Sequence, residues 1–262
     1  MSIYDIHGTD ISGGGSITIN TTGNDSIVKS VSHRGTLTNG KLQGYINAKK
    51  AGFQYGENDT NFTSDGYVVM RHDGTITIEG VSTSIANLTY AELMAVDPDI
   101  PTLQEWLECM KCITLYPYID TKRWSGTWSA SNLQNAVGIV KDFGYADKCT
   151  WLIGTIDEAD TILTSIPNAR IGWLSDPTTA NVTSLLTKKT DENDLFFDSD
   201  YTRLTSEYIQ NCITNGIPLE VYTISTQEHF NQAYALSNYI SGFTCNGTIV
   251  PSALLMSKYI MS

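Results

Sequence analysis

Charged side chains are scarce in this sequence, and basic ones are the scarcer kind. Only 17% of the 262 residues are charged, and 28 acidic against 16 basic side chains give a formal net charge of −12. A chain with this balance lacks the basic surface with which proteins bind nucleic acid or anionic membranes. We therefore expect neither as a partner.

Long hydrophobic runs are also missing. No run is long enough to cross a bilayer, and the first 30 residues have neither the basic start nor the apolar stretch of a secretory signal. We expect a chain without a membrane span or a classical signal peptide. Its location is then the cytoplasm, or the surface of a cell or virion.

Cysteine is infrequent and scattered, with five residues in the chain. An odd, dispersed set does not indicate a disulfide framework. Cys109 and Cys112 form a C-x-x-C pair, for which a redox site or a zinc site is the alternative interpretation. The surrounding segment has helical apolar spacing, and no second pair or histidine cluster has zinc spacing. We expect two small buried side chains on a helix.

From residue 26 onward, short apolar runs alternate with segments of helical period. The expected strands are residues 27–32, 53–59, 114–120, 150–153, 170–174, 194–197, 219–223 and 242–245. Helical segments between them include residues 42–51, 133–143, 157–166 and 206–215, and Ser129 and Thr205 are suited to cap two of these helices. Strands that alternate with helices form parallel βαβ units. Eight such units predict an α/β fold, a closed (β/α)8 TIM barrel, because an open doubly wound sheet would need a glycine-rich phosphate loop that is missing here.

The chain divides into two unequal parts. A glycine-rich stretch separates two short alternating runs in residues 1–25, which we expect to form an N-terminal appendage or hairpin. Residues 26–262 form the predicted barrel, with an insertion at about 62–112 after the second strand. Such an insertion lies at the end of a barrel where βα loops build active sites.

Ionisable side chains gather where the expected strands end. They are His33 and Arg34 after the first strand, Glu57 and Asp59 on the second, Asp120 and Lys122 on the third, and Arg71, His72 and Asp73 after the inserted strand. Side chains alternate along a strand, so Glu57 and Asp59 point the same way. Each residue taken singly is more often an ordinary surface or core residue. Their joint placement favours a functional site.

These residue types fit one kind of chemistry. Three convergent carboxylates repel one another unless a hard cation such as Mg²⁺ or Ca²⁺ lies between them. A cation beside Arg34 and Lys122 favours a phosphate group, and the two histidines can serve as general base and general acid. Metal-assisted phosphoryl transfer follows as a hypothesis.

The order and spacing of these motifs resemble the glycerophosphodiester phosphodiesterase family of metal-dependent TIM-barrel enzymes, over about residues 26–262. The matching segments are S-H-R-G at 32–35, A-G-F-Q-Y-G-E-N-D at 51–59, T-S-D-G-Y-V-V-M-R-H-D at 63–73, Y-I-D-T-K at 118–122 and G-I-P-L-E-V-Y-T at 216–223. Less specific similarity covers residues 87–93 and 100–105 of the insertion.

The resemblance implies hydrolysis of glycerophosphodiesters, such as deacylated phospholipids, to glycerol 3-phosphate and an alcohol. The implied site consists of the acid–base pair His33 and His72, the Mg²⁺ or Ca²⁺ ligands Glu57, Asp59 and Asp120, and the phosphate partners Arg34 and Lys122. We expect His33 to be the base and His72 the acid, although the resemblance leaves their order open. A small phosphodiester is the expected substrate, and a glycerol-phosphate polymer of cell walls is the alternative.

The sequence departs from the family in three places. Asp120 stands where the family usually has the longer Glu, residues 38–41 read T-N-G-K where it has P-E-N-T, and residues 243–246 read F-T-C-N where the eighth strand usually ends in Thr-Asp. A non-catalytic binding module on the same barrel is therefore a second class of function. A zinc hydrolase acting on C–N bonds is less compatible with only four histidines. The oligomeric state stays open.

Overall fold

Eight parallel strands form a closed barrel in the computed structural model, which describes residues 29–35, 40–121, 129–234 and 239–247. The barrel strands are β1 (Lys29–His33), β2 (Tyr55–Phe62), β6 (Tyr116–Asp120), β7 (Thr150–Ile153), β8 (Arg170–Leu174), β9 (Asp194–Asp200), β10 (Leu219–Ile224) and β11 (Gly242–Cys245). β1 pairs with β11 on one side and with β2 on the other, which closes the ring. The predicted TIM barrel is confirmed. The expected appendage, residues 1–25, lies outside the described residues.

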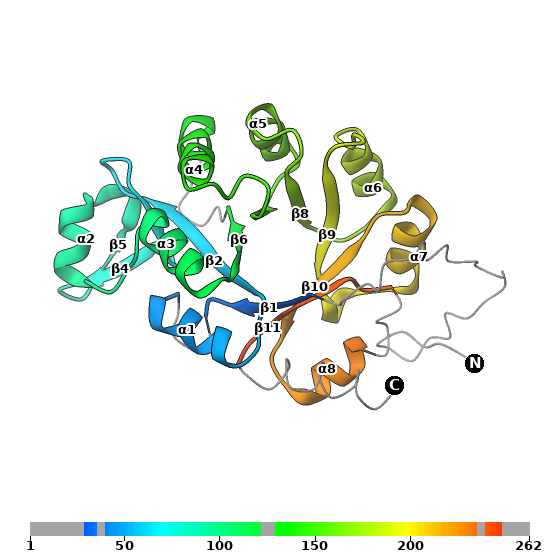
Figure 1. Cartoon of the computed structure of the whole chain (residues 1–262), viewed down its shortest axis with the longest axis horizontal. Helices are drawn as coiled ribbons and strands as arrows, with labels where there is room; N and C mark the ends of the chain where they lie inside the picture. The colour runs from blue at the N-terminus through cyan, green and yellow to red at the C-terminus, as the bar shows by residue number, and fades with distance from the viewer. Residues whose placement is uncertain (1–28, 36–39, 122–128, 235–238, 248–262) are drawn as a thin grey trace.

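Helices connect consecutive barrel strands and surround them (Figure 1). They are α1 (Leu42–Lys50), α3 (Leu103–Ile113), α4 (Ala130–Asp142), α5 (Asp157–Ser165), α6 (Thr179–Leu186), α7 (Ser206–Asn215) and α8 (Gln227–Tyr234), with a short 3-10 turn η2 (Tyr201–Arg203) before α7. Ser129 and Thr205 cap α4 and α7 as predicted, because each side chain accepts a hydrogen bond from a backbone N–H in the first turn. The largest apolar cluster packs these helices against the outer face of the barrel.

The insertion follows β2 and has a small apolar core of its own. Its elements before α3 are β3 (Val68–Met70), β4 (Thr75–Ile78), β5 (Val81–Ser84), η1 (Ile85–Asn87) and α2 (Tyr90–Val96). β3 pairs antiparallel with the end of β2, so the insertion is a direct continuation of the barrel wall. Thr89 and Thr102 each open a helix with a reciprocal capping box.

The C-x-x-C pair lies on α3, as the helical spacing predicts. The prediction that both side chains are buried is wrong: Cys109 is partly exposed and Cys112 is exposed. The apolar face of α3 is instead formed by Leu103, Trp106, Leu107 and Met110, which pack on the barrel. Both cysteines are free thiols.

The inside of the barrel is packed at one end, where apolar side chains surround one buried charged network. Val31, Tyr118, Leu152 and Phe196 form an interior cluster. Among them lies Arg170, whose guanidinium donates to Glu220 at 2.6 Å, Asp194 at 2.7 Å and the Tyr118 hydroxyl at 2.9 Å. Burial disfavours the charge of Arg170, but Glu220, Tyr118 and Asp194 together outweigh this and raise the pKa of the guanidinium. This network forms the floor of the space in which the functional side chains lie.

None of the helices in the part of the chain that the structure describes is both long and apolar enough to cross a membrane.

Candidate active site

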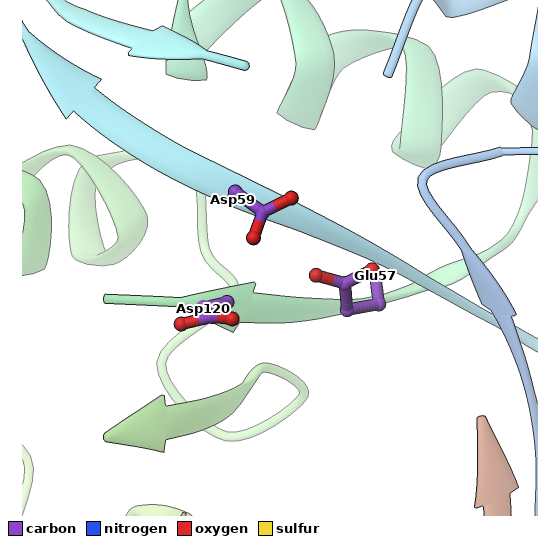
Figure 2. Close-up of side chains that lie close together, drawn as sticks. All are labelled: Glu57, Asp59 and Asp120. Atoms are coloured by element: carbon purple, nitrogen blue, oxygen red, sulfur yellow. The ribbon is translucent and has the colours of Figure 1, made fainter. Parts of the chain in front are cut away.

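Three carboxylates from two neighbouring strands converge at the C-terminal mouth of the barrel. Asp59 on β2 is the direct register partner of Asp120 on β6, and Glu57 lies two residues before Asp59 on the same face (Figure 2). One oxygen from each lies within 4.8 Å of the other two, and all three side chains are buried. The shorter side chain of Asp120 therefore still brings an oxygen close to the other two carboxylates.

The backbone around these carboxylates is held from several sides. The Tyr45 hydroxyl donates to the Glu57 carbonyl at 2.8 Å, and the Thr60 hydroxyl donates to the Asp120 carbonyl at 2.8 Å. The backbone N–H of Arg34 donates to the Glu57 carboxylate at 3.1 Å, and its Nε lies 3.2 Å from Asp59 Oδ2. These contacts fix where the acidic oxygens point before any ligand binds.

The donor set fits a hard divalent cation. Three buried carboxylates with one nearby guanidinium leave an excess of negative charge in a space of low dielectric constant, which is costly without a compensating cation. Oxygen-only donors are the set that Mg²⁺ and Ca²⁺ select over softer metals. Glu57, Asp59 and Asp120 can therefore hold such an ion.

His33, at the end of β1, lies beside this cluster. Its Nε2 is 3.9 Å from Glu57 Oε2, and its Nδ1 is 2.6 Å from the Asn246 side-chain oxygen. The Asn246 amide nitrogen donates to the Ser225 hydroxyl, so its oxygen is left to accept from His33. Nδ1 then carries the proton and Nε2 presents a lone pair to the cavity. The strand ends sharply because Gly35 takes a φ of +63°, where a Cβ would lie 3.0 Å from the Gly44 backbone.

His72 is delivered by the insertion, just beyond β3. The backbone N–H of Arg71 donates to the Asp59 carbonyl at 2.9 Å, which holds this segment against the end of β2. The His72 Nδ1 is 2.7 Å from Asp73 Oδ1, and this hydrogen bond lowers the pKa of the Asp73 carboxyl. The Nδ1 atom of His72 therefore faces a carboxylate, whereas the Nδ1 atom of His33 faces a neutral amide.

Lys41, the basic residue of the T-N-G-K segment, contacts acidic residues of the insertion. Lys41 Nζ lies 2.7 Å from Asp99 Oδ2 and 3.8 Å from Asp97 Oδ1, and Asp97 also pairs with Arg71 at 3.3 Å. Lys41 thus anchors the insertion. Lys122 lies outside the described residues.

A cavity of about 280 Å³ occupies the mouth, with His33, Arg34, Glu57 and Asp120 in its wall. The remaining lining residues are Leu152, Gly154, Leu174, Asp198, Tyr222, Thr223 and Thr244. His72 does not line this cavity in the structure. Two of the three acidic residues therefore share one space with His33 and Arg34.

Asp198 is the lining residue that the sequence analysis missed. The expected strand ended at Phe197, because Asp-Ser-Asp resembles a loop, whereas β9 continues to Asp200. Alternation along β9 places Phe197 on the outer face and Asp198 inside. Burial raises the pKa of the Asp198 carboxyl well above its usual range, and the neighbouring Glu220 and Asp120 carboxylates raise it further.

A closed parallel barrel with an acidic cluster and a histidine at the C-terminal ends of its strands defines a TIM-barrel protein with a candidate metal site. Residues 33–237 match the glycerophosphoryl diester phosphodiesterase family, and the chain belongs to this family. No curated protein sequence matches the chain.

Solved structures of this family have the same fold. A Silicibacter pomeroyi protein assigned as a glycerophosphoryl diester phosphodiesterase is 16% identical, with a TM-score of 0.74 over 90% of this chain and 95% of that one. The glycerophosphodiester phosphodiesterase of Thermotoga maritima is 20% identical, with a TM-score of 0.69 over 88% and 98% of the two chains. An Oleispira antarctica phosphodiesterase, 15% identical with a TM-score of 0.71 over 89% and 97%, was solved with the product sn-glycerol-3-phosphate. At these identities the likeness establishes the fold.

Proposed function

We propose that this chain hydrolyses glycerophosphodiesters to glycerol 3-phosphate and an alcohol, with Mg²⁺ or Ca²⁺ as cofactor. The observation that carries the proposal is the cluster of Glu57, Asp59 and Asp120 in the mouth of the barrel, beside His33 and Arg34. Family membership and a relative solved with sn-glycerol-3-phosphate support the same substrate class.

The proposed ligands of the divalent cation are Glu57, Asp59 and Asp120. When bound, the cation polarises the phosphodiester and offsets the charge that develops on its oxygens. Arg34 stands beside this site and stabilises the same charge, because its guanidinium lies against Asp59 at the rim of the cluster. Lys122 is assigned the same task on its sequence position alone, two residues after Asp120.

The partners of the two histidines favour different proton-transfer roles. Asn246 accepts from Nδ1 of His33, which leaves Nε2 with a lone pair that can remove a proton from water or from a neighbouring substrate hydroxyl. The Asp73 carboxylate lies 2.7 Å from Nδ1 of His72 and orients that ring from the insertion. We therefore assign His33 as the base and His72 as the acid that protonates the departing alkoxide.

Turnover measured on two substrates tests the proposal. Glycerophosphocholine and bis(p-nitrophenyl) phosphate are each incubated with Mg²⁺, with Ca²⁺ and with a chelator, and cation binding is followed by calorimetry. We expect cation-dependent release of glycerol phosphate, lost in Glu57→Gln and kept in Lys188→Ala, a change at a partly buried residue far along the chain that does not line the cavity.

The other outcomes separate the alternatives. Turnover of the chromogenic ester alone would retain the chemistry and exclude the small substrate, in favour of a glycerol-phosphate polymer. No turnover of either substrate by a cation-loaded protein would contradict the enzyme assignment and favour a binding module.

A further inference from the structure

Asp198 faces the acidic cluster from across the barrel. In the closed order of strands, β9 is separated from β2 by three strands in either direction, so the two strands lie on opposite sides of the ring (Figure 1). Glu57 and Asp198 nevertheless line the same cavity. A ligand that fills this space is therefore in contact with both sides.

The Asp198 carboxyl lacks a partner that its burial demands. The residue is 1% exposed, and among the described residues nothing forms a hydrogen bond with its Oδ1. The next residue, Ser199, is equally buried, but its hydroxyl donates to the Ser175 carbonyl at 2.7 Å. Buried polar atoms are nearly always paired, because an unpaired one has lost its hydrogen bonds to water without replacement. A bound ligand would supply the hydrogen-bonding group that Asp198 lacks within the protein.

The surroundings of Asp198 define the chemistry of that group. The proposed function places the phosphate across the barrel from β9, beside Arg34 and the β2 carboxylates of the candidate cation site. With the phosphate held there, the space beside Asp198 is left to an ester arm, and the apolar side chains of Leu152 and Leu174 flank the same cavity. Burial raises the pKa of the Tyr222 phenol to about 12, so this neighbour remains a neutral hydrogen-bonding group. A neutral hydroxyl can pair with a carboxyl in this setting, whichever of the two donates.

We propose that Asp198 is a specificity-determining residue that forms a hydrogen bond with a hydroxyl of the polyol arm of the phosphodiester. The inference rests on the proposed function, because that function fixes which side of the cavity holds the phosphate. A diester whose phosphate lies at the acidic cluster extends one ester arm toward β9. Arms that carry hydroxyl groups are thereby selected over alkyl arms of the same length.

A pair of ligands that differ only in their hydroxyls tests this role. Binding of glycerol 3-phosphate and of n-propyl phosphate is measured by calorimetry on the Mg²⁺-loaded protein. In Asp198→Leu we expect the affinity for glycerol 3-phosphate to fall about tenfold and that for n-propyl phosphate to stay within about twofold. Asp198→Asn keeps the shape and both hydrogen-bonding functions, so it retains most of the preference. Ser199→Ala, on the same strand but facing outward, is the matched control.

Equal loss of both ligands in Asp198→Leu, or reduced Mg²⁺ affinity, would overturn the inference and assign Asp198 to the cation or to the fold. Unchanged discrimination would overturn it as well. If the wild-type protein fails to hydrolyse diesters yet shows the Asp198-dependent preference, the proposed function falls and the polyol subsite stands. If the wild-type protein hydrolyses diesters without that dependence, the subsite falls and the function stands. If neither ligand binds the wild-type protein, the subsite falls, and the turnover measurement alone decides the proposed function.

Discussion

His33 and His72 differ in what holds them. The His33 ring is oriented by an amide, Asn246, just after the last barrel strand. An amide oxygen fixes the tautomer of the ring without adding negative charge beside it. The His72 ring lies against a carboxylate, Asp73, on the insertion. The two residues therefore have different proton-transfer roles in the proposed reaction.

This difference gives a prediction that separates the base from the acid. His33→Ala and His72→Ala are each expected to lower kcat on glycerophosphocholine by about 10²–10⁴-fold, the usual contribution of a positioned acid or base. The leaving group of bis(p-nitrophenyl) phosphate departs without a proton. On this substrate His72→Ala is expected to keep most of the wild-type kcat, and His33→Ala to keep little of it. Steady-state kinetics measure both, with circular dichroism as the check on folding. Recovery by His33→Ala alone would reverse the assignment.

Asp198 also has a consequence for stability. Its raised pKa means that the folded protein retains a proton that the unfolded chain releases above the ordinary value of 3.8. The native state is therefore progressively penalised as the pH rises from about 4 through the pKa of the folded protein. Asp198→Asn removes this penalty, so the variant is expected to have the higher Tm at pH 7 and to converge with the wild type near pH 4. Thermal unfolding across this pH range, with a chelator present, measures the difference. A gap that widens toward acid pH would contradict the raised pKa.

At the scale of elements, β8 holds the barrel floor together through one side chain. Arg170 compensates the charge of Glu220, which is 1% exposed, and its guanidinium lies 4.0 Å from the centre of the Phe196 ring. Removing one partner of such a pair leaves an uncompensated buried charge.

We expect Arg170→Met to lower the free energy of unfolding by about 3–5 kcal/mol. Lys188→Ala is the control, because it breaks an ion pair with Asp160 whose carboxylate is 60% exposed, and such pairs contribute about 0–1 kcal/mol. Urea denaturation of both variants measures the contrast. An equal loss of the free energy of unfolding in both variants would contradict a larger contribution from the Arg170 network.

The strands and their ends show how much of the structure the sequence predicts. All eight barrel strands could be located because a strand buried on both faces is a short apolar run between helical segments. The residues at which these strands end could not be located in the same way. β2 runs three residues past Asp59, and β9 three past Phe197, because strands that end in a polar site carry the side chains that elsewhere indicate a loop. The acidic cluster could be predicted from alternation on β2, whereas Asp198 lay beyond the point where its strand was expected to stop.

For the whole molecule, the net charge of −12 opposes the approach of an anionic substrate. Three carboxylates, Arg34 and a divalent cation sum to zero locally, so the long-range field is set by the rest of the surface. Screening of this field by salt is substantial beyond about 10 Å at 0.1 M.

We therefore expect kcat/KM for a net-anionic diester, such as glycerophosphoglycerol, to rise about twofold to fivefold between low salt and 0.2 M salt. Glycerophosphocholine, which carries no net charge, is expected to change less. Initial rates at several ionic strengths measure both. A fall for the anionic substrate would mean that attraction at the mouth exceeds repulsion by the molecule as a whole.

The packed floor also decides how molecules pass through the barrel. Phe196, Tyr118, Leu152 and Val31 fill its lower interior, with Arg170 between them. Entrance and exit are therefore the same opening, on the side where the insertion stands. In the proposed reaction the product leaves through the opening by which the next substrate enters, so glycerol phosphate competes with each incoming diester for it.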